Sequence, residues 1–203
     1  MLIIGLTGNL GTGKSTVAAM FAKRGFKIID ADAVTRDLLA PGKKCVKKVA
    51  KVFPCVIIKK VKINRSELAK IVFNIPCELQ KLTDILYPEA LKVVKSQISR
   101  YKQEPFVVLD VPLLFESGWD KITDTTIVVK AGRAQQFSRV HKRSKTTYSD
   151  ITRRLKNQMP LKQKCDMADM IIDNSHDLRQ TRTQVDAIIN SLLRRRRNPR
   201  RNQ

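Results

Sequence analysis

The sequence has few cysteines and no long apolar run, and each scarcity excludes a class of protein. The four cysteines, Cys45, Cys55, Cys77 and Cys165, show no Cys-x-x-Cys spacing and no histidine at metal-ligand spacing. They are typical of free thiols in a reducing compartment. No apolar run has the length of a membrane-spanning helix, and the first thirteen residues lack the basic start of a signal peptide. We therefore expect a cytoplasmic protein without a membrane partner.

Acidic and aromatic residues are also scarce. Against 40 Lys and Arg the chain has 18 Asp and Glu, a formal net charge of +22, and only 5% of its residues are aromatic. Such a positive field favours anionic partners of many kinds and selects none of them. The arginine-rich end, residues 194–203, cannot bury itself, so it is predicted to be a disordered tail that binds polyanions non-specifically.

What the sequence does contain is a complete phosphate-binding motif. The stretch Gly8-Asn9-Leu10-Gly11-Thr12-Gly13-Lys14-Ser15 matches G-x-x-x-x-G-K-[ST] between a predicted strand and a predicted helix. In this motif backbone N–H groups and the helix N-terminus surround phosphates, the lysine reaches the β- and γ-phosphates and the serine hydroxyl ligates Mg²⁺. A Gly-rich turn with no phosphate-binding role would match this motif by chance in about one chain of this length in a hundred. Binding of ATP and Mg²⁺ is therefore predicted, through Gly8, Asn9, Leu10, Gly11, Thr12, Gly13, Lys14, Ser15 and Thr16.

Short apolar runs separated by helical patterns predict the fold class. Continuous apolar stretches are typical of parallel strands that are covered on both faces. A capping box begins at Asn64, and Pro76 and Pro88 suit first-turn helix positions. We expect an α/β fold with a doubly wound, mostly parallel, five-stranded sheet. The predicted strands are 2–6, 27–29, 106–109, 126–129 and 170–172, and the predicted helical regions include 13–24 and most of 64–104.

Three carboxylates follow predicted strands at the edge of the sheet where ligands bind. Asp30 and Asp32 come directly after the second strand, and either could orient or deprotonate an attacking hydroxyl or hold Mg²⁺ through water. The alternative is that one of them caps the helix that starts near Ala33. Asp110 is at a Walker-B-like position, where it supports the metal, unless it merely terminates its strand.

Two further segments are candidate parts of a transfer site. The residues after Asp110, Val111-Pro112-Leu113-Leu114-Phe115-Glu116, are too apolar for a solvated loop and are interpreted as lining a substrate. The segment 135–164 is strongly cationic and suits a lid that neutralises phosphate oxygens and excludes water. Within it Arg143 is the functional candidate, whereas the other cations could form an ordinary solvated face and His141 is expected at the surface.

Together these residues resemble the dephospho-coenzyme A kinase family from residue 1 to about 193. The phosphate loop is common to many families, but Asp30-Ala31-Asp32 and Pro112-Leu113-Leu114-Phe115-Glu116 are more specific to this one. Other similar stretches are Pro41-Gly42, Gln158-Met159-Pro160-Leu161 and Ile172-Asp173-Asn174-Ser175. The resemblance implies one kinase domain, 1–193, with a helical substrate lobe at about 56–104 and a lid at about 144–166.

The resemblance also implies an activity and residue roles. The activity is ATP-dependent phosphorylation of the 3′-hydroxyl of the dephospho-coenzyme A ribose. Asp32 would act on that hydroxyl, Lys14 on the phosphates and Arg143 from the lid, and Asn174 would lie near the adenine of ATP. The metal would be held by Ser15 and Asp110. The predicted substrate-binding residues are Asp30, Asp32, Tyr87, Pro112, Leu113, Leu114 and Phe115.

Departures from the family pattern leave two rival functions open. Family members commonly have His-Pro where this chain has Tyr87-Pro88, and residues 43–62 are unusually rich in lysine. A kinase of another small hydroxyl compound or nucleotide is the nearer alternative. The second alternative, suggested by the high positive charge, is a nucleic-acid-binding ATPase. The scarcity of aromatic residues and the spread of the charge along the chain argue against specific nucleic-acid binding.

Overall fold

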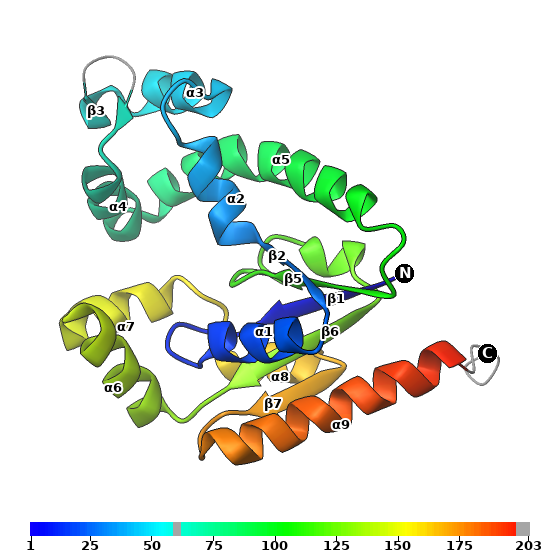
Figure 1. Cartoon of the computed structure of the whole chain (residues 1–203). Helices are drawn as coiled ribbons and strands as arrows, with labels where there is room; N and C mark the ends of the chain where they lie inside the picture. The colour runs from blue at the N-terminus through cyan, green and yellow to red at the C-terminus, as the bar shows by residue number, and fades with distance from the viewer. Residues whose placement is uncertain (59–61, 198–203) are drawn as a thin grey trace.

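The centre of the molecule is a five-stranded sheet in which every neighbouring pair of strands is parallel (Figure 1). The computed structural model describes residues 1–58 and 62–197. The strand order β2-β5-β1-β6-β7 confirms the predicted α/β fold with five parallel strands. All five residues of β5 are buried, which explains its continuous apolar sequence. The strands are β1 (Leu2–Thr7), β2 (Lys27–Asp30), β5 (Phe106–Asp110), β6 (Thr125–Lys130) and β7 (Met170–Asp173).

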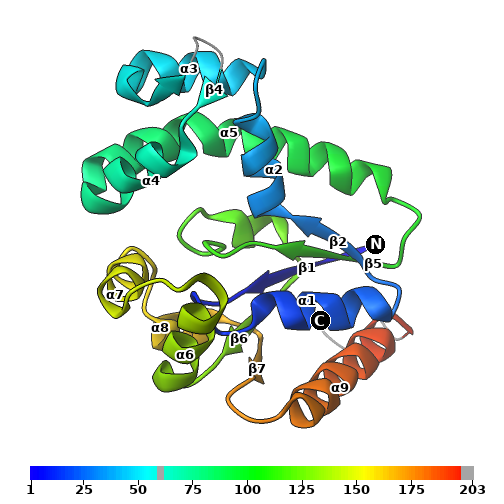
Figure 2. The same cartoon turned by 60° about the vertical axis from the view of Figure 1, so that its left-hand side comes forward.

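Helices cover both faces of this sheet, and each face has its own core (Figure 2). On one face α1 (Lys14–Lys23) and α9 (Leu178–Arg197) pack on β1, β6 and β7 through residues such as Phe21, Ile127 and Val185. On the other face α2 (Ala31–Leu38) and the second half of α5 (Pro76–Arg100) pack on β2 and β5. A short helix, η2 (Trp119–Ile122), adds Trp119 to this second core.

A helical lobe extends from the sheet between β2 and β5, in the region predicted to bind substrate. It contains α3 (Lys44–Val52), η1 (Pro54–Val56), α4 (Arg65–Asn74) and the start of α5, around a separate core. The Asn64 side chain accepts a hydrogen bond from the Glu67 N–H, so the predicted capping residue is confirmed. The lobe also has two short antiparallel strands that sequence reasoning missed, β3 (Ile57–Ile58) and β4 (Lys62–Ile63).

Pro88 is placed inside α5, so the prediction that it occupies a first turn is wrong, whereas Pro76 does begin the helix. Proline inside a helix removes a hydrogen bond and costs about 3 kcal/mol. Leu86 on one side of Pro88 is buried in the lobe core, and Ala90 and Val94 on the other side are buried in the sheet core. Burial on both sides of the proline keeps the helix continuous.

A second group of helices faces the lobe from the other end of the chain, where the lid was predicted. It consists of α6 (Arg133–Ser144), α7 (Tyr148–Lys156) and α8 (Leu161–Met167). A small core of Phe137, Val140 and Ile151 joins α6 to α7, and Leu10 of the phosphate loop packs against it. His141 is exposed, as predicted.

The last helix is longer than expected, because Arg194–197 continue α9 although they were predicted to belong to a disordered tail. Arginine is a good helix former, and positive side chains near a helix C-terminus interact favourably with its dipole. The rest of that predicted tail, residues 198–203, lies outside the described residues. None of the helices in the described part of the chain is long and apolar enough to cross a membrane.

Candidate active site

The phosphate loop connects β1 to α1 and has a backbone that other residues would not adopt easily. Gly13 has a φ of 88°, and a Cβ at this position would collide with the side-chain amide of Asn174. Gly11 has a φ of 82°, and a Cβ there would lie 2.5 Å from the carbonyl oxygen of Gln136. The motif glycines are therefore required by conformation and by close packing together.

Asn174 and Arg139 hold this loop from the side of β7 and α6. The Asn174 Nδ2 donates to the Thr12 carbonyl at 2.8 Å, and its Oδ1 accepts from the Thr181 hydroxyl at 2.8 Å. Arg139 donates to the carbonyls of Thr12, at 3.3 Å, and Asn174, at 2.8 Å. The structure thus places Asn174 against the phosphate loop, 2% exposed. Its contact with ATP stays a prediction.

A cavity of about 680 Å³ opens in front of the phosphate loop. It brings together Lys14, Ser15, Asp32 and Arg143, which the sequence placed on three separate grounds: the phosphate-loop motif, the end of a strand and the cationic segment. Pro112 and Leu113 line the same cavity. The remaining lining residues are Gly8, Asn9, Leu10, Gly11, Gly13, Thr16, Leu79, Arg139, Val140, Arg154, Asn157 and Gln158.

Lys14 is surrounded by carboxylates at one end of this cavity. Its Nζ forms a salt bridge with the Asp110 Oδ1, and both side chains are largely buried. Burial raises the pKa of Asp110 above its ordinary value, the Lys14 charge and hydrogen bond oppose this rise, and Asp30 and Asp32 add to it. Burial likewise raises the pKa of Asp32, with Lys14 opposing and Asp30 adding to the rise. Lys14 is therefore the cation that opposes the rise in the pKa of both carboxyl groups.

The structure decides which of the paired aspartates caps the next helix. The Asp30 Oδ1 accepts the Ala33 N–H at 2.9 Å, and its Oδ2 is 3.6 Å from the Arg36 guanidinium. Asp30 is thus the N-cap of α2, whereas Asp32 lies in the first turn and lines the cavity. The capping alternative is settled for Asp30, whose substrate contact stays a prediction.

Leu114 is a core residue, so its predicted contact with substrate is wrong. Its side chain is fully buried with Val111 and Trp119, and a Cβ on Gly5 would lie 2.8 Å from its Cδ2. The chain turns after β5, and this turn directs Leu114 into the core while Leu113 lines the cavity. The sequence could not separate these two adjacent leucines by their chemistry.

Tyr87 and Phe115 lie near the cavity but do not line it. The Tyr87 ring centroid is 6.1 Å from that of Trp119. Burial raises the pKa of Tyr87 to about 12, and the charges of Glu116 and Asp32 add to the rise. Its phenol is therefore neutral at physiological pH, and Tyr87 lies on the Asp32 side of the site.

Sequence reasoning left out several lining residues, of which Arg139 and Arg154 are the most important. Both belong to the cationic segment that could have been a solvated face. Arg139 precedes Arg143 by four residues on one helix, a spacing that puts both on the same face. That spacing was the available signal. Arg154 belongs to another helix, α7, so only the tertiary structure shows that it lines the same cavity.

Comparison with known proteins decides the family to which this site belongs. The family model described as Dephospho-CoA kinase matches residues 2–180. The chain belongs to the dephospho-CoA kinase family. It uses ATP to phosphorylate dephospho-CoA, which gives CoA. This finding removes both rival functions that the sequence left open.

Individual relatives agree with this assignment. The chain is 36% identical over 191 residues to a dephospho-CoA kinase of Oceanobacillus iheyensis, covering 93% of this chain and 96% of the relative. Among solved structures, TT1252 from Thermus thermophilus has a TM-score of 0.82 and 31% identity over 94% of this chain and 97% of that one. Dephospho-CoA kinase from Campylobacter jejuni has a TM-score of 0.69 and 25% identity, with coverage of 94% and 96%.

Proposed function

We propose that the cavity binds ATP and dephospho-CoA side by side and that Asp32 acts on the attacking 3′-hydroxyl of the ribose. The observation that carries this proposal is the position of Asp32: it lines the same cavity as Lys14 and Ser15, while Asp30 does the capping. A carboxylate in this position can accept the hydroxyl proton or hold the hydroxyl in line with the phosphorus. Its raised pKa makes it a better proton acceptor than an aspartate with the ordinary pKa.

The cations around the cavity suit the charge of the transferred group. Lys14 would exchange its salt bridge with Asp110 for the β- and γ-phosphates of ATP. Arg143 and Arg154 reach the cavity from α6 and α7, and Arg139 from the first of these helices. Phosphoryl transfer is catalysed mainly by positioning and by charge stabilisation, so these arginines would neutralise the equatorial oxygens.

The residues beside Lys14 also fit Mg²⁺. Ser15 lines the cavity, and the buried Asp110 carboxylate lies beside Lys14. Among the described residues no group of three His, Cys, Asp or Glu side chains could hold a metal by itself. This agrees with Mg²⁺, which usually keeps several waters and combines one or two protein oxygens with substrate phosphates. Bound there, Mg²⁺ would neutralise charge on the β- and γ-phosphates, with Ser15 as ligand and Asp110 supporting it.

Other predicted contacts remain part of this proposal. Asn174 would border the adenine of ATP, since it packs against the phosphate loop beside Arg139. Pro112 and Leu113 would border the acceptor, because they line the same cavity as Asp32, and Tyr87 would lie beside it, because the charge of Asp32 adds to the rise in the Tyr87 pKa. The four free cysteines fit a reducing compartment, and we keep the cytoplasm as the proposed location.

The Asp32→Asn variant tests the central role. Asparagine keeps the size of the side chain but cannot take a proton, so kcat with dephospho-CoA should fall by about 10²- to 10⁴-fold. Affinity for ATP should change little, because Lys14 and the loop amides provide that binding. The measurement is a coupled assay with identification of CoA as the product, together with direct titration of ATP.

Asp30→Asn is the matched control for this experiment. Asparagine caps helices nearly as well as aspartate, so a residue that only caps should show almost unchanged turnover. A kcat for Asp32→Asn within about threefold of the original would reject the proposed role. Collapse of ATP affinity together with kcat would assign Asp32 to organising the metal instead.

A further inference from the structure

Among the residues that the structure describes, Lys164 is the lysine whose side chain is completely buried, and it does not line the cavity. The side chain of Lys164, on α8, has 0% exposure. Its Nζ donates to the Pro112 carbonyl at 2.7 Å and forms a salt bridge with the Glu116 Oε1 at 2.9 Å. Both partners belong to the loop after β5 whose residues Pro112 and Leu113 line the cavity. Lys164 therefore holds the acceptor side of the site without touching a ligand.

The atoms that Lys164 binds are shared with two other elements. The Glu116 Oε1 also accepts the Met159 N–H at 2.8 Å. The Pro112 carbonyl also accepts the hydroxyl of Thr7, the last residue of β1, at 3.1 Å. Through these atoms, α8, the segment before it, the loop after β5 and the end of β1 meet at one point.

The segment before α8 continues this connection to the phosphate loop. The Leu10 N–H donates to the Gln158 Oε1 at 3.0 Å, and the Asn9 Nδ2 donates to the Met159 carbonyl at 3.0 Å. The Asn9 bond fixes the orientation of its amide, and the Asn9 Oδ1 is buried without a hydrogen-bond partner among the described residues. Residues 158–159 are thus bonded to the ATP side of the cavity and, through Glu116, to the acceptor side.

The buried pair of Lys164 and Glu116 is better suited to positioning the loop after β5 than to stabilising the fold. Burial lowers the pKa of Lys164 below its ordinary value, while the hydrogen bond and charge of Glu116 oppose the fall. Desolvation of a buried ion pair often cancels its Coulomb attraction, so such a pair contributes little net stability. The hydrogen bonds of the pair to two backbone groups, the Pro112 carbonyl and the Met159 N–H, instead restrict the loop to one geometry.

We propose that Lys164 is a positioning residue of the transfer reaction, which through Glu116 and Pro112 fixes the acceptor-side loop relative to the phosphate loop. The inference rests on the proposed placement of the acceptor beside Pro112 and Leu113. Transfer requires the hydroxyl and the γ-phosphate to be aligned closely, and a misplacement of 1 Å can cost about 10²-fold in rate. Lys164 thus acts on the reaction at a distance, through the loop it holds.

Lys164→Met tests this inference, because methionine fills a similar volume without charge or donors. We expect kcat to fall by about 10²-fold, or KM for dephospho-CoA to rise correspondingly, while the Kd of ATP changes less than about threefold. Lys162→Met, an exposed position on the same helix, is the control and should retain the original kinetics. The fraction of folded protein is measured by thermal unfolding in parallel, so that lost activity is counted per folded molecule.

Two substitutions at Glu116 give an independent test if Lys164→Met does not fold. Glu116→Gln keeps an oxygen for Lys164 and Met159 and should lose less activity than Glu116→Ala, which removes it. Full activity per folded molecule in Lys164→Met, or in Glu116→Ala, would overturn the inference. Asp32→Asn, measured beside them, tests the acceptor site by itself. Failure of the positioning role is thereby distinguished from failure of the proposed site.

Discussion

At the scale of single residues, Lys14 lies close to two carboxyl groups whose pKa is raised. Asp32 and Asp110 both have a pKa raised by burial, and Lys14 is the cation that opposes the rise in each case. Desolvation disfavours the charged form of a carboxyl group, so these side chains are less stable as anions than exposed aspartates. Two carboxyl groups with raised pKa values beside Lys14 add little to stability at neutral pH, which fits the functional role proposed for them.

This burial predicts how turnover and stability depend on pH. Protonated Asp32 cannot take the hydroxyl proton. As the pH is lowered, kcat should therefore begin to fall while the pH is still above 3.8, the ordinary pKa of aspartate. The folded-state pKa is higher than the unfolded one. The contribution of Asp32 to the free energy of unfolding is therefore greatest below pH 3.8. It is lost as the pH rises through the pKa of Asp32 in the folded state.

Asp32→Asn is the variant that checks both parts of this prediction. At neutral pH it should unfold at a temperature equal to or above that of the original chain, because a neutral amide avoids the desolvation of the charge. Thermal unfolding between pH 4 and 8 and a kcat profile over the same range are the measurements. A variant that is clearly less stable at neutral pH would contradict the assigned cause of the pKa shift.

At the scale of elements, two helices, α6 and α7, present arginines to the cavity. Arg143, near the end of α6, lines the cavity although its side chain is largely exposed to solvent in this state. An exposed cation contributes little to stability but can stabilise transferring charge once water is excluded. A role of Arg143 in the reaction therefore stays a prediction that its position in the cavity supports.

Arg143→Met is expected to lower kcat by about 10²-fold, the cost of removing one donor to transition-state charge, with thermal stability nearly unchanged. The neighbouring Lys142→Met provides the comparison, since Lys142 is exposed on the same helix and does not line the cavity. Steady-state kinetics of both variants decide the matter. Equal, small effects in the two would mean that Arg143 belongs to the solvated face that the sequence also allowed.

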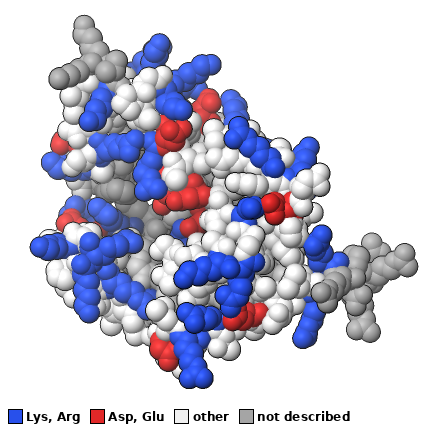
Figure 3. All heavy atoms as spheres, viewed as in Figure 1, with Lys and Arg blue, Asp and Glu red and all other residues white. Residues whose placement is uncertain are grey.

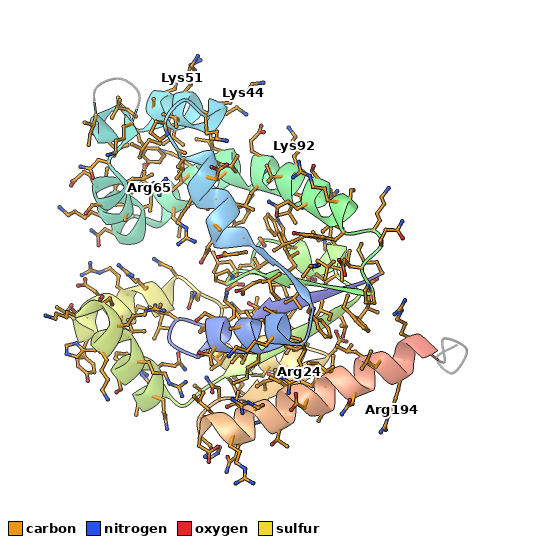
Figure 4. All side chains as sticks on the ribbon, viewed as in Figure 1. Arg24, Lys44, Lys51, Arg65, Lys92 and Arg194 are labelled. Carbon is orange, nitrogen blue, oxygen red and sulfur yellow. The ribbon has the colours of Figure 1, made fainter. Side chains whose placement is uncertain are left out.

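At the scale of the whole molecule, positive charge is spread over all parts of the structure. Lys and Arg side chains lie on the lobe, the lid and α9 across the face shown in Figure 3, whereas acidic side chains are few. Lys44 and Lys51 on α3, Lys92 on α5 and Arg194 on α9 point away from the body of the protein (Figure 4). Such a distribution attracts anions over long distances, including both anionic substrates, without forming a specific polyanion site.

Removal of residues 194–203 tests what the arginine-rich end contributes. The deletion removes six arginines and lowers the net charge from +22 to +16. Leu192 is buried in the core, whereas Arg194, Arg195 and Arg196 are exposed, so folding and kcat should be retained. The shortened chain should elute from heparin at lower salt, because fewer counterions are released on binding. Loss of kinase activity at moderate salt with unchanged stability would refute this prediction.

Local sequence patterns were sufficient to predict the phosphate loop, the parallel sheet and the family. These features depend on local patterns: glycine spacing before a helix, short apolar strands, and a carboxylate at a strand end. Tertiary structure alone decided that Asp30 caps and Asp32 faces the cavity, that Leu114 is buried while Leu113 is not, and that Pro88 lies inside a helix. It also brought Lys164 to Pro112, 52 residues away. The physical reason is that side-chain burial and hydrogen bonding across such separations are set by how elements pack, which no local pattern specifies.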